Sequence, residues 1–323
     1  LIFYSGLLMR TPACRGKIVN LITTDGGMHM KDLVQDGGSL AGASSFEDGV
    51  DRRVFLKAAI GTGFAAAVLP VEAQTLVKTD VTGLSSGDHI IVVNGQDVPV
   101  YRAQPEGKTN PPVILVISEI FGVHEYIKDV ARRLAKQGYM AVAPDLFVRA
   151  GDASKVPNIA DLMRDIVGKT PDAQVMLDLD TVVSWAKQRG GDTEKLGITG
   201  FCWGGRITWL YAAHNPKVKA GVAWYGRLAG DATPNSPKHP IDIAQNLKAP
   251  VLGLYGGKDT GIPLDSVEKM RAALDKGNSG SAFQVYPNSG HAFHADYRPS
   301  FNEPDAKDGW RRALDWFRTH GVV

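Results

Sequence analysis

The chain has little cysteine, almost no charge bias and no long apolar run. Its 323 residues include two cysteines, Cys14 and Cys202, and 36 basic residues stand against 34 acidic ones, a formal net charge of +2. So few cysteines exclude a disulfide framework. The balanced charge gives no support to nucleic acid as a partner, since that binding depends on a basic surface. With 44% hydrophobic residues, the composition is that of an ordinary globular protein.

The most apolar segment is too short to cross a bilayer. It runs from Ala58 to Leu69, follows the pair Arg52-Arg53, and is succeeded by small residues around Ala73. This order predicts a twin-arginine export signal over residues 51–74, with a short anchor helix as the alternative. We therefore expect the mature chain to be periplasmic or extracellular and free of the membrane.

Residues 1–50 carry no pattern that is typical of a fold. We interpret them as an N-terminal extension without stable structure, and Met28 or Met30 is a candidate start. Cleavage after the signal would also remove Cys14. The mature chain would then hold one thiol, Cys202, in an oxidising compartment where an idle exposed cysteine is a liability.

From Asp88 onward, strand and helix patterns alternate. Two β-rich runs around Asn94-Gly95 predict a hairpin. Further strands are expected at 112–118, 139–143, 196–199, 219–225, 250–255 and 282–286, and helices at 127–138, 172–188, 207–213, 264–274 and 310–319. The segment 147–170 predicts a loop with a short helix. The alternation indicates an α/β fold: a doubly wound, mostly parallel sheet with helices on both faces and an N-terminal β-hairpin.

One stretch places a nucleophile between a strand and a helix. The apolar run 196–199 leads into Gly200-Phe201-Cys202-Trp203-Gly204-Gly205, and a helical pattern follows. Flanking glycines let strand and helix approach, as in the G-x-S-x-G elbow, with Cys202 in place of serine. The helix dipole favours a thiolate there and sets the N–H of Trp203 beside a developing oxyanion. The alternative is a small buried cysteine in a glycine-rich turn.

Three more reactive side chains, Glu119, Asp259 and His291, each directly follow a predicted strand. The carboxyl ends of parallel strands share one edge of a sheet, so we expect these groups to gather around Cys202. The order nucleophile, acid, histidine is that of the α/β-hydrolase fold. His291 would move the thiol proton and Asp259 would fix its tautomer.

Each of these residues also has a structural interpretation. Asp259 could be an ordinary turn residue, His291 a surface loop residue, and Glu119 an ion-pair partner of Arg132. Their joint placement at strand ends, in hydrolase order, favours the catalytic interpretation.

Five short motifs resemble the dienelactone hydrolase family, the carboxymethylenebutenolidases. They are Gly-Phe-Cys-Trp-Gly-Gly at 200–205, Glu-Ile-Phe-Gly at 119–122, Ala-Pro-Asp-Leu-Phe at 143–147, Gly-Lys-Asp at 257–259 and Gly-His-Ala-Phe at 290–293. The likeness covers roughly residues 85–320, and we expect the catalytic domain over 85–321.

The resemblance implies the roles of specific residues. It implies a catalytic triad and an oxyanion hole, formed by Cys202, His291 and Asp259 and by the backbone N–H groups of Ile120 and Trp203. It also implies that Glu119 holds the resting thiol until substrate displaces it. A carboxylate beside a thiol can take its proton, whereas an unguarded thiolate would oxidise.

The sequence departs from the family at the arginines that bind a substrate carboxylate. Four residues beyond the catalytic histidine stands Ala295, with Arg298 nearby. The other arginine could be Arg164 or Arg149, because no spacing decides between them. Arg164 and Arg298 are the candidates for substrate binding, and dienelactone itself is not established as the substrate.

The chemistry expected is that of a carboxylic ester hydrolase, acting on a small ester or lactone through a thioester acyl-enzyme. The alternatives are amide or peptide hydrolysis by the same triad, and a non-catalytic ligand-binding or redox-sensing member of the fold. No cofactor or metal is expected, since the spacing of His291 and His294 fits no common zinc motif. We expect a monomer or a small homo-oligomer.

Overall fold

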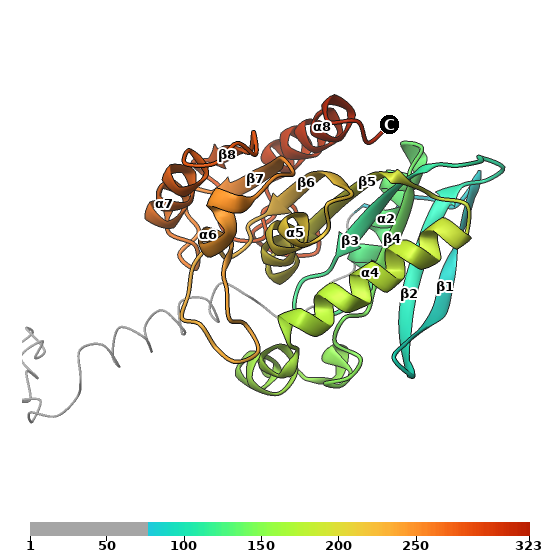
Figure 1. Ribbon diagram of the computed structural model, residues 1–323, viewed down its shortest axis with the longest axis horizontal. Helices are drawn as coiled ribbons and strands as arrows, with labels where there is room; N and C mark the ends of the chain where they lie inside the picture. Colours follow the sequence, from blue (N-terminus) through green and yellow to red (C-terminus); the bar gives the residue numbers. More distant parts are fainter. Residues whose placement is uncertain (1–76) are drawn as a thin grey trace, which may run out of the picture. The chain divides into compact units, whose positions relative to one another are not determined.

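The computed structural model describes residues 77–323, which form one eight-stranded sheet covered by helices (Figure 1). The order of the strands is β1-β2-β4-β3-β5-β6-β7-β8. The extension predicted for residues 1–50 and the export signal predicted for 51–74 lie outside the described residues.

The sheet begins with the predicted hairpin and continues as a parallel sheet. β1 (Leu84–Val93) and β2 (Gln96–Pro105) pair antiparallel, and β2 pairs antiparallel with β4 (Met140–Pro144). All other neighbours are parallel; they are β3 (Pro112–Ile117), β5 (Asp192–Phe201), β6 (Val218–Trp224), β7 (Val251–Gly256) and β8 (Ala282–Tyr286). This confirms the predicted α/β-hydrolase fold with a doubly wound, mostly parallel sheet.

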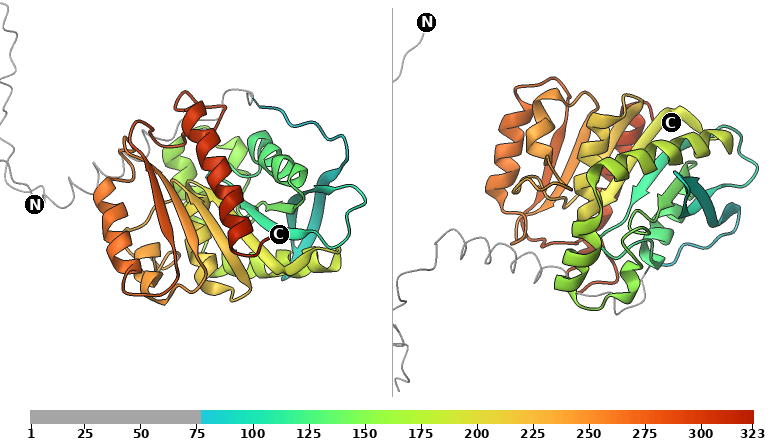
Figure 2. Two further views of the ribbon diagram at one scale, coloured as in Figure 1. Left: turned by 90° about the horizontal axis from the view of Figure 1, so that it is seen from above. Right: turned by 60° about the horizontal axis from the view of Figure 1, so that its bottom comes forward.

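Helices cover both faces of the sheet. The long ones are α2 (Glu125–Lys136), α4 (Asp172–Gln188), α5 (Trp203–His214), α7 (Leu264–Leu274) and α8 (Glu303–Thr319). α2 and α8 lie on one side of the sheet, and α4 and α5 on the other (Figure 2). Because both faces are covered, β3, β4 and β7 are buried along their whole length, which explains their continuous apolar sequences.

Short helices occupy two of the segments that connect the long elements. Between β4 and α4 these are η1 (Ala153–Lys155), α3 (Ile159–Asp161), η2 (Leu162–Ile166) and η3 (Val167–Lys169), and before β7 they are α6 (Pro240–Ile243) and η4 (Ala244–Asn246). Within residues 77–323, no helix has the length and apolar character that a membrane span requires.

The last helix starts seven residues earlier than the apolar pattern predicts. Asn302 caps α8 by accepting a hydrogen bond from the N–H of Asp305, and Pro304 occupies its first turn. A side-chain cap and a proline set this boundary, and neither contributes to apolar periodicity.

A buried ion pair fixes the start of α5. The guanidinium of Arg206 donates to both carboxylate oxygens of Asp172, at 2.7 Å each, and to the carbonyl of Lys238 at 2.8 Å. Asp172 is the first residue of α4 and Lys238 belongs to the loop after β6. The pair therefore ties the helix that follows Cys202 to two neighbouring segments.

Replacing Asp172 with alanine would leave the buried Arg206 charge without its partner. We expect Asp172→Ala to lower the free energy of unfolding by about 3 kcal/mol, the usual cost of breaking a buried pair. Denaturant unfolding measures the change. The control is Asp265→Ala, which removes an exposed pair with Lys269 and should change stability little. Equal stability losses in the two variants would contradict the conclusion that the Arg206–Asp172 pair holds α5 in place.

Candidate active site

Cys202 lies at the apex of a strained turn between β5 and α5. Its φ of 54° and ψ of −112° are unusual for a residue with a side chain, and its N–H donates to the carbonyl of Trp224 at 3.0 Å. The residue is the N-cap of α5, so the thiol faces the positive end of the helix dipole. Such strain is characteristic of functional turns.

Two glycines make this turn possible because no side chain fits at their positions. A Cβ at Gly200 would collide with the carbonyl of Gly204, and one at Gly204 would collide with the carbonyls of Ile117 and Ser118 at the end of β3. α5 therefore starts directly against the end of β3. Trp203, the first residue of α5, and Ile120, in the turn after β3, belong to these two adjoining segments.

His291 and Asp259 meet in the loops after β8 and β7. The Nδ1 atom of His291 lies 2.7 Å from Oδ2 of Asp259, and both side chains are buried. The other carboxylate oxygen of Asp259 accepts hydrogen bonds from the N–H groups of Gly261 at 2.9 Å and Ile262 at 3.1 Å. The carboxylate is thereby oriented toward the imidazole.

Cys202 also interacts electrostatically with the imidazole, so the sulfur, the imidazole and the carboxylate act on one another. Burial lowers the pKa of His291, but the charge of Cys202 and the hydrogen bond with Asp259 raise it to about 10. Protonated His291 is thus favoured through neutral pH beside the sulfur. The arrangement can move a proton between the thiol and a bound reactant.

Glu119 lies after β3 and is held by three other side chains. Tyr297 donates its hydroxyl hydrogen to Oε2 of Glu119, and Nε2 of His124 lies 3.6 Å from the same oxygen. Nε of Arg298 lies 3.8 Å from Oε1 and donates to the Tyr297 hydroxyl at 3.1 Å. Burial raises the pKa of Glu119, but the Arg298 charge and the His124 and Tyr297 contacts bring it down to about 2. Glu119 is therefore a carboxylate at neutral pH.

The alternative that Glu119 pairs with Arg132 is wrong. Arg132 contacts Glu125 and Asp129 on its own helix and donates to the carbonyl of Thr79 at 3.1 Å. The side chain of Arg132 extends toward Thr79, and the ion-pair partner of Glu119 is Arg298.

The two candidate substrate-binding arginines have different surroundings. Arg298 is buried, and its guanidinium lies 5.0 Å from the ring centre of Phe121. Burial lowers the pKa of Arg298, but the charge of Glu119 and the contact with Tyr297 raise it, so the guanidinium stays charged. Arg164 is exposed and pairs with Asp161 and Asp165, so the structure does not bring it together with the other site residues.

Comparison with known proteins identifies the family of the chain. The sequence pattern of the dienelactone hydrolase family matches residues 98–321. The chain belongs to the dienelactone hydrolase family. It is a dienelactone-hydrolase-like hydrolase of the ester and lactone type.

Several relatives resemble nearly the whole described chain. A "Putative carboxymethylenebutenolidase" of Methylorubrum extorquens is 57% identical over 275 residues, which cover 85% of this chain and 94% of the relative. A protein of the same name from Salmonella typhimurium is 55% identical over 80% of this chain and 96% of its own. The crystal structure of a "Putative Dienelactone Hydrolase" from Klebsiella pneumoniae is 55% identical with a TM-score of 0.72, and covers 73% of this chain and 98% of its own.

Three members of the site were missed by sequence reasoning. His124 and Tyr297 contact the Glu119 carboxylate, and the ring of Tyr225 lies edge-on to that of His291 at 5.2 Å. Tyr225 directly follows β6 and has a positive φ of 38°, whereas His124 and Tyr297 lie further along the loops after β3 and β8. Tyr225 and Tyr297 have no local sequence signal for this role, because the groups that they contact belong to other loops.

His294 has a structural role within this family member. Its Nδ1 lies 2.6 Å from the hydroxyl of Tyr126, and its ring packs between those of Phe201 and Trp310. Burial and the Arg133 charge lower the pKa of His294 to about 3, so the ring is neutral. In the part of the chain that the structure describes, histidine, cysteine and acidic side chains form no group of three that could hold a metal ion.

The charge of Asp259 should raise the pKa of His291, and a titration of the imidazole can measure this effect. In Asp259→Asn we expect the pKa of His291 to fall from about 10 toward the ordinary histidine value, because a raising charge is lost while burial remains. Imidazole NMR titration measures it. Asp265→Asn, which changes an exposed pair with Lys269, is the control. An unchanged midpoint in Asp259→Asn would show that this carboxylate does not stabilise the imidazolium.

Proposed function

We propose that the protein hydrolyses carboxylic esters or lactones, with Cys202 as nucleophile, His291 as general base and acid, and Asp259 orienting the imidazole. The supporting observation is that the strained Cys202 turn, the N-terminus of α5 and the 2.7 Å His291–Asp259 pair meet at the carboxyl edge of the sheet. Nucleophile, base and orienting group are thus within reach of one another.

In the first step, Cys202 attacks the carbonyl carbon as a thiolate, because His291, protonated at neutral pH, already holds its proton. The carbonyl π electrons move to oxygen, and the N–H groups of Ile120 and Trp203 stabilise that oxyanion. When the intermediate collapses, the bond to the leaving oxygen breaks and His291 gives this oxygen its proton. The products are a thioester on Cys202 and an alcohol or enol.

In the second step, water completes the reaction. His291 takes a proton from water as the water oxygen attacks the thioester carbon, and the carbon–sulfur bond of the tetrahedral intermediate then breaks. Sulfur leaves as a thiolate beside the protonated His291, which restores the starting pair, and the acid departs. No oxidant or further reactant is needed.

Arg298 and Glu119 supply the substrate-recognition part of the proposal. An acidic substrate could place its carboxylate on Arg298, in competition with Glu119, and the freed Glu119 would then lie close to the sulfur. The low pKa of Glu119 and its contact with Arg298 imply that it stays a carboxylate while it keeps this partner, so the thiol proton remains on His291. Arg164, exposed and paired with its own segment, is not needed for this binding.

Removing the sulfur tests the function directly. Cys202→Ala should lower kcat/KM for activated esters and lactones by about 1,000-fold or more, as loss of a nucleophile does in other triad enzymes. Circular dichroism would show retained folding, and intact-protein mass spectrometry of the unmodified chain would show an acyl adduct on Cys202.

An unchanged rate in Cys202→Ala would remove the hypothesis. Matched esters and amides separate ester cleavage from the peptidase alternative. Failure to form any acyl adduct, with no turnover of either class, would favour the non-catalytic interpretation.

We also propose that the chain is exported by the twin-arginine route. Arg52→Lys with Arg53→Lys keeps the charge but removes the pair that the export machinery requires, so the full chain should accumulate in the cytoplasm. Cell fractionation measures the distribution. Lys57→Arg is the charge-preserving control. The proposal fails if the double variant and the control distribute alike.

A further inference from the structure

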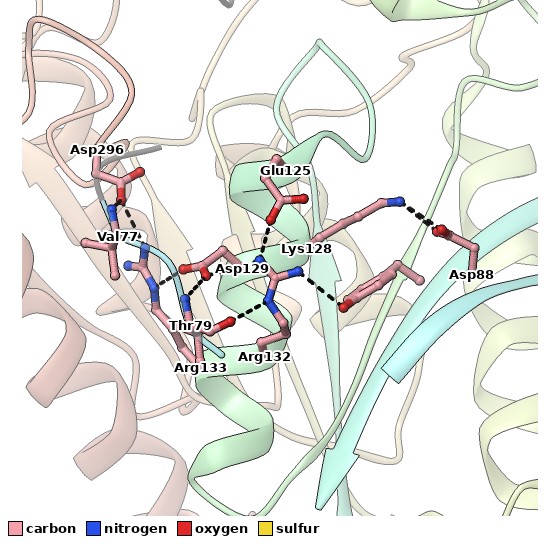
Figure 3. A network of polar contacts seen from close by, with 10 residues as sticks. Val77, Thr79, Asp88, Glu125, Lys128, Asp129, Arg132, Arg133 and Asp296 are labelled. Carbon is pink, nitrogen blue, oxygen red and sulfur yellow. Dashed lines mark hydrogen bonds and ion pairs between the residues drawn. The ribbon is translucent and has the colours of Figure 1, made fainter. Parts of the chain in front are cut away.

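The segment 77–82 is fastened along α2 by main-chain and side-chain hydrogen bonds. The N–H of Thr79 donates to Oδ1 of Asp129 at 2.6 Å, and its carbonyl accepts from Nε of Arg132 at 3.1 Å. One turn later, Nζ of Lys136 donates to Asp80 at 3.0 Å and to the carbonyl of Thr82 at 2.7 Å. Figure 3 shows Thr79 between Asp129 and Arg132. This segment, which directly precedes β1, is therefore an ordered part of the domain.

The same segment reaches the loop that carries His291. The N–H of Val77 donates to Oδ2 of Asp296 at 2.7 Å, and this oxygen also accepts from Arg133 at 3.1 Å. Arg133 in turn donates through Nε to Asp129 at 2.5 Å. Figure 3 shows Asp296 facing both Val77 and Arg133. The buried carboxylates of Asp129 and Asp296 thus share one arginine on α2.

Asp296 directly precedes the two residues that hold Glu119. Tyr297 donates to the Glu119 carboxylate, and Arg298 lies 3.8 Å from it. The loop is tightly turned here, because the N–H of Arg298 donates to the carbonyl of Ala295 at 3.0 Å. Asp296 thus lies in the same turn as the two residues that contact Glu119.

The buried carboxylate of Asp296 contributes little to the stability of the fold, which indicates that its role lies in positioning the loop. Among the described residues, its Oδ1 atom is buried and has no hydrogen-bond partner, while Oδ2 has the two described above. Asn could accept the same two hydrogen bonds but would lose the charge pair with Arg133. A buried acidic group with half of its oxygens unsatisfied contributes little net stability.

We propose that Asp296 is a positioning residue for substrate recognition: together with the Val77 N–H and Arg133, it fixes Tyr297 and Arg298 against Glu119. Asp296 does not touch the reacting atoms and acts through Arg298. The consequence for activity rests on the proposed function, whereas the effect of Asp296 on the charge around Cys202 can be measured without it.

The test compares alkylation of Cys202 by an anionic and a neutral reagent. Iodoacetate and iodoacetamide differ in charge, so the ratio of their rates reports whether Arg298 faces the sulfur. We expect this ratio to fall about threefold or more in Asp296→Asn and in Val77→Pro, since a displaced guanidinium attracts an anion less. Val77→Pro removes only a main-chain donor outside the loop, which keeps the test valid if Asp296→Asn fails to fold.

Two controls accompany these variants. Asp265→Asn removes an exposed carboxylate, and Val81→Pro changes an exposed position of the same segment; both should keep the ratio of the unmodified chain. Equal slowing of both reagents in Asp296→Asn and Val77→Pro would indicate a general structural effect, and that outcome, like an unchanged ratio, overturns the inference.

Ester kinetics then connect the inference with the function. With matched acidic and neutral esters, Asp296→Asn should raise KM for the acidic ester about three- to tenfold, the effect of one lost polar contact, and leave the neutral ester nearly unchanged. Combining Asp296→Asn with Tyr297→Phe should raise this KM little further than either change alone, because both changes act on the contact of Glu119 with its partners. Full additivity would contradict the inference. Activity that survives Cys202→Ala would instead contradict the proposed function and leave the alkylation result standing.

Discussion

The close approach of main chain between β3, β5 and α5 is the constraint on which the site depends. Gly204 lies against the carbonyl of Ile117, so any side chain there would push α5 away from β3. This approach sets Cys202 beside the turn that carries Ile120, and it is maintained by backbone contacts that few substitutions can alter. The hydrogen bonds from Arg206 to Asp172 and Lys238 hold α5 against α4 and the loop after β6. Because several elements determine the turn, the unfavourable φ at Cys202 can persist.

The site contains two buried carboxylates, and each of them faces a different positively charged partner. Asp259 is oriented by two backbone N–H groups and faces His291, so its charge supports an imidazolium. The charge of Glu119 is balanced by Arg298, which lowers its pKa and makes it a poor competitor for the proton that His291 carries. The same residue type thus has two roles, which are set by partners that are distant in sequence.

The elements and the strand-end residues could be predicted from the sequence, but the contacts between loops could not. α4 and α7 have the boundaries expected from their apolar periodicity, and Cys202 follows a strand as its glycine-rich motif predicts. Tyr297 has no such local signal, because its role depends on reaching a carboxylate 178 positions earlier in the chain. Arg164 lies in an irregular segment without a fixed period, so spacing could not show that its side chain turns to Asp165.

One loop carries both His291 and Arg298, and this limits how substrate can enter. The guanidinium lies over the rings of Phe121 and Tyr297, at 5.0 and 5.1 Å, so it cannot swing freely toward a ligand. Moving the whole loop would displace the imidazole from Asp259 and remove the proton carrier. Under the proposed function, an acidic substrate would come to a stationary Arg298 and displace Glu119, whose side chain belongs to another loop. Recognition then changes the surroundings of the sulfur without disturbing the His291–Asp259 pair.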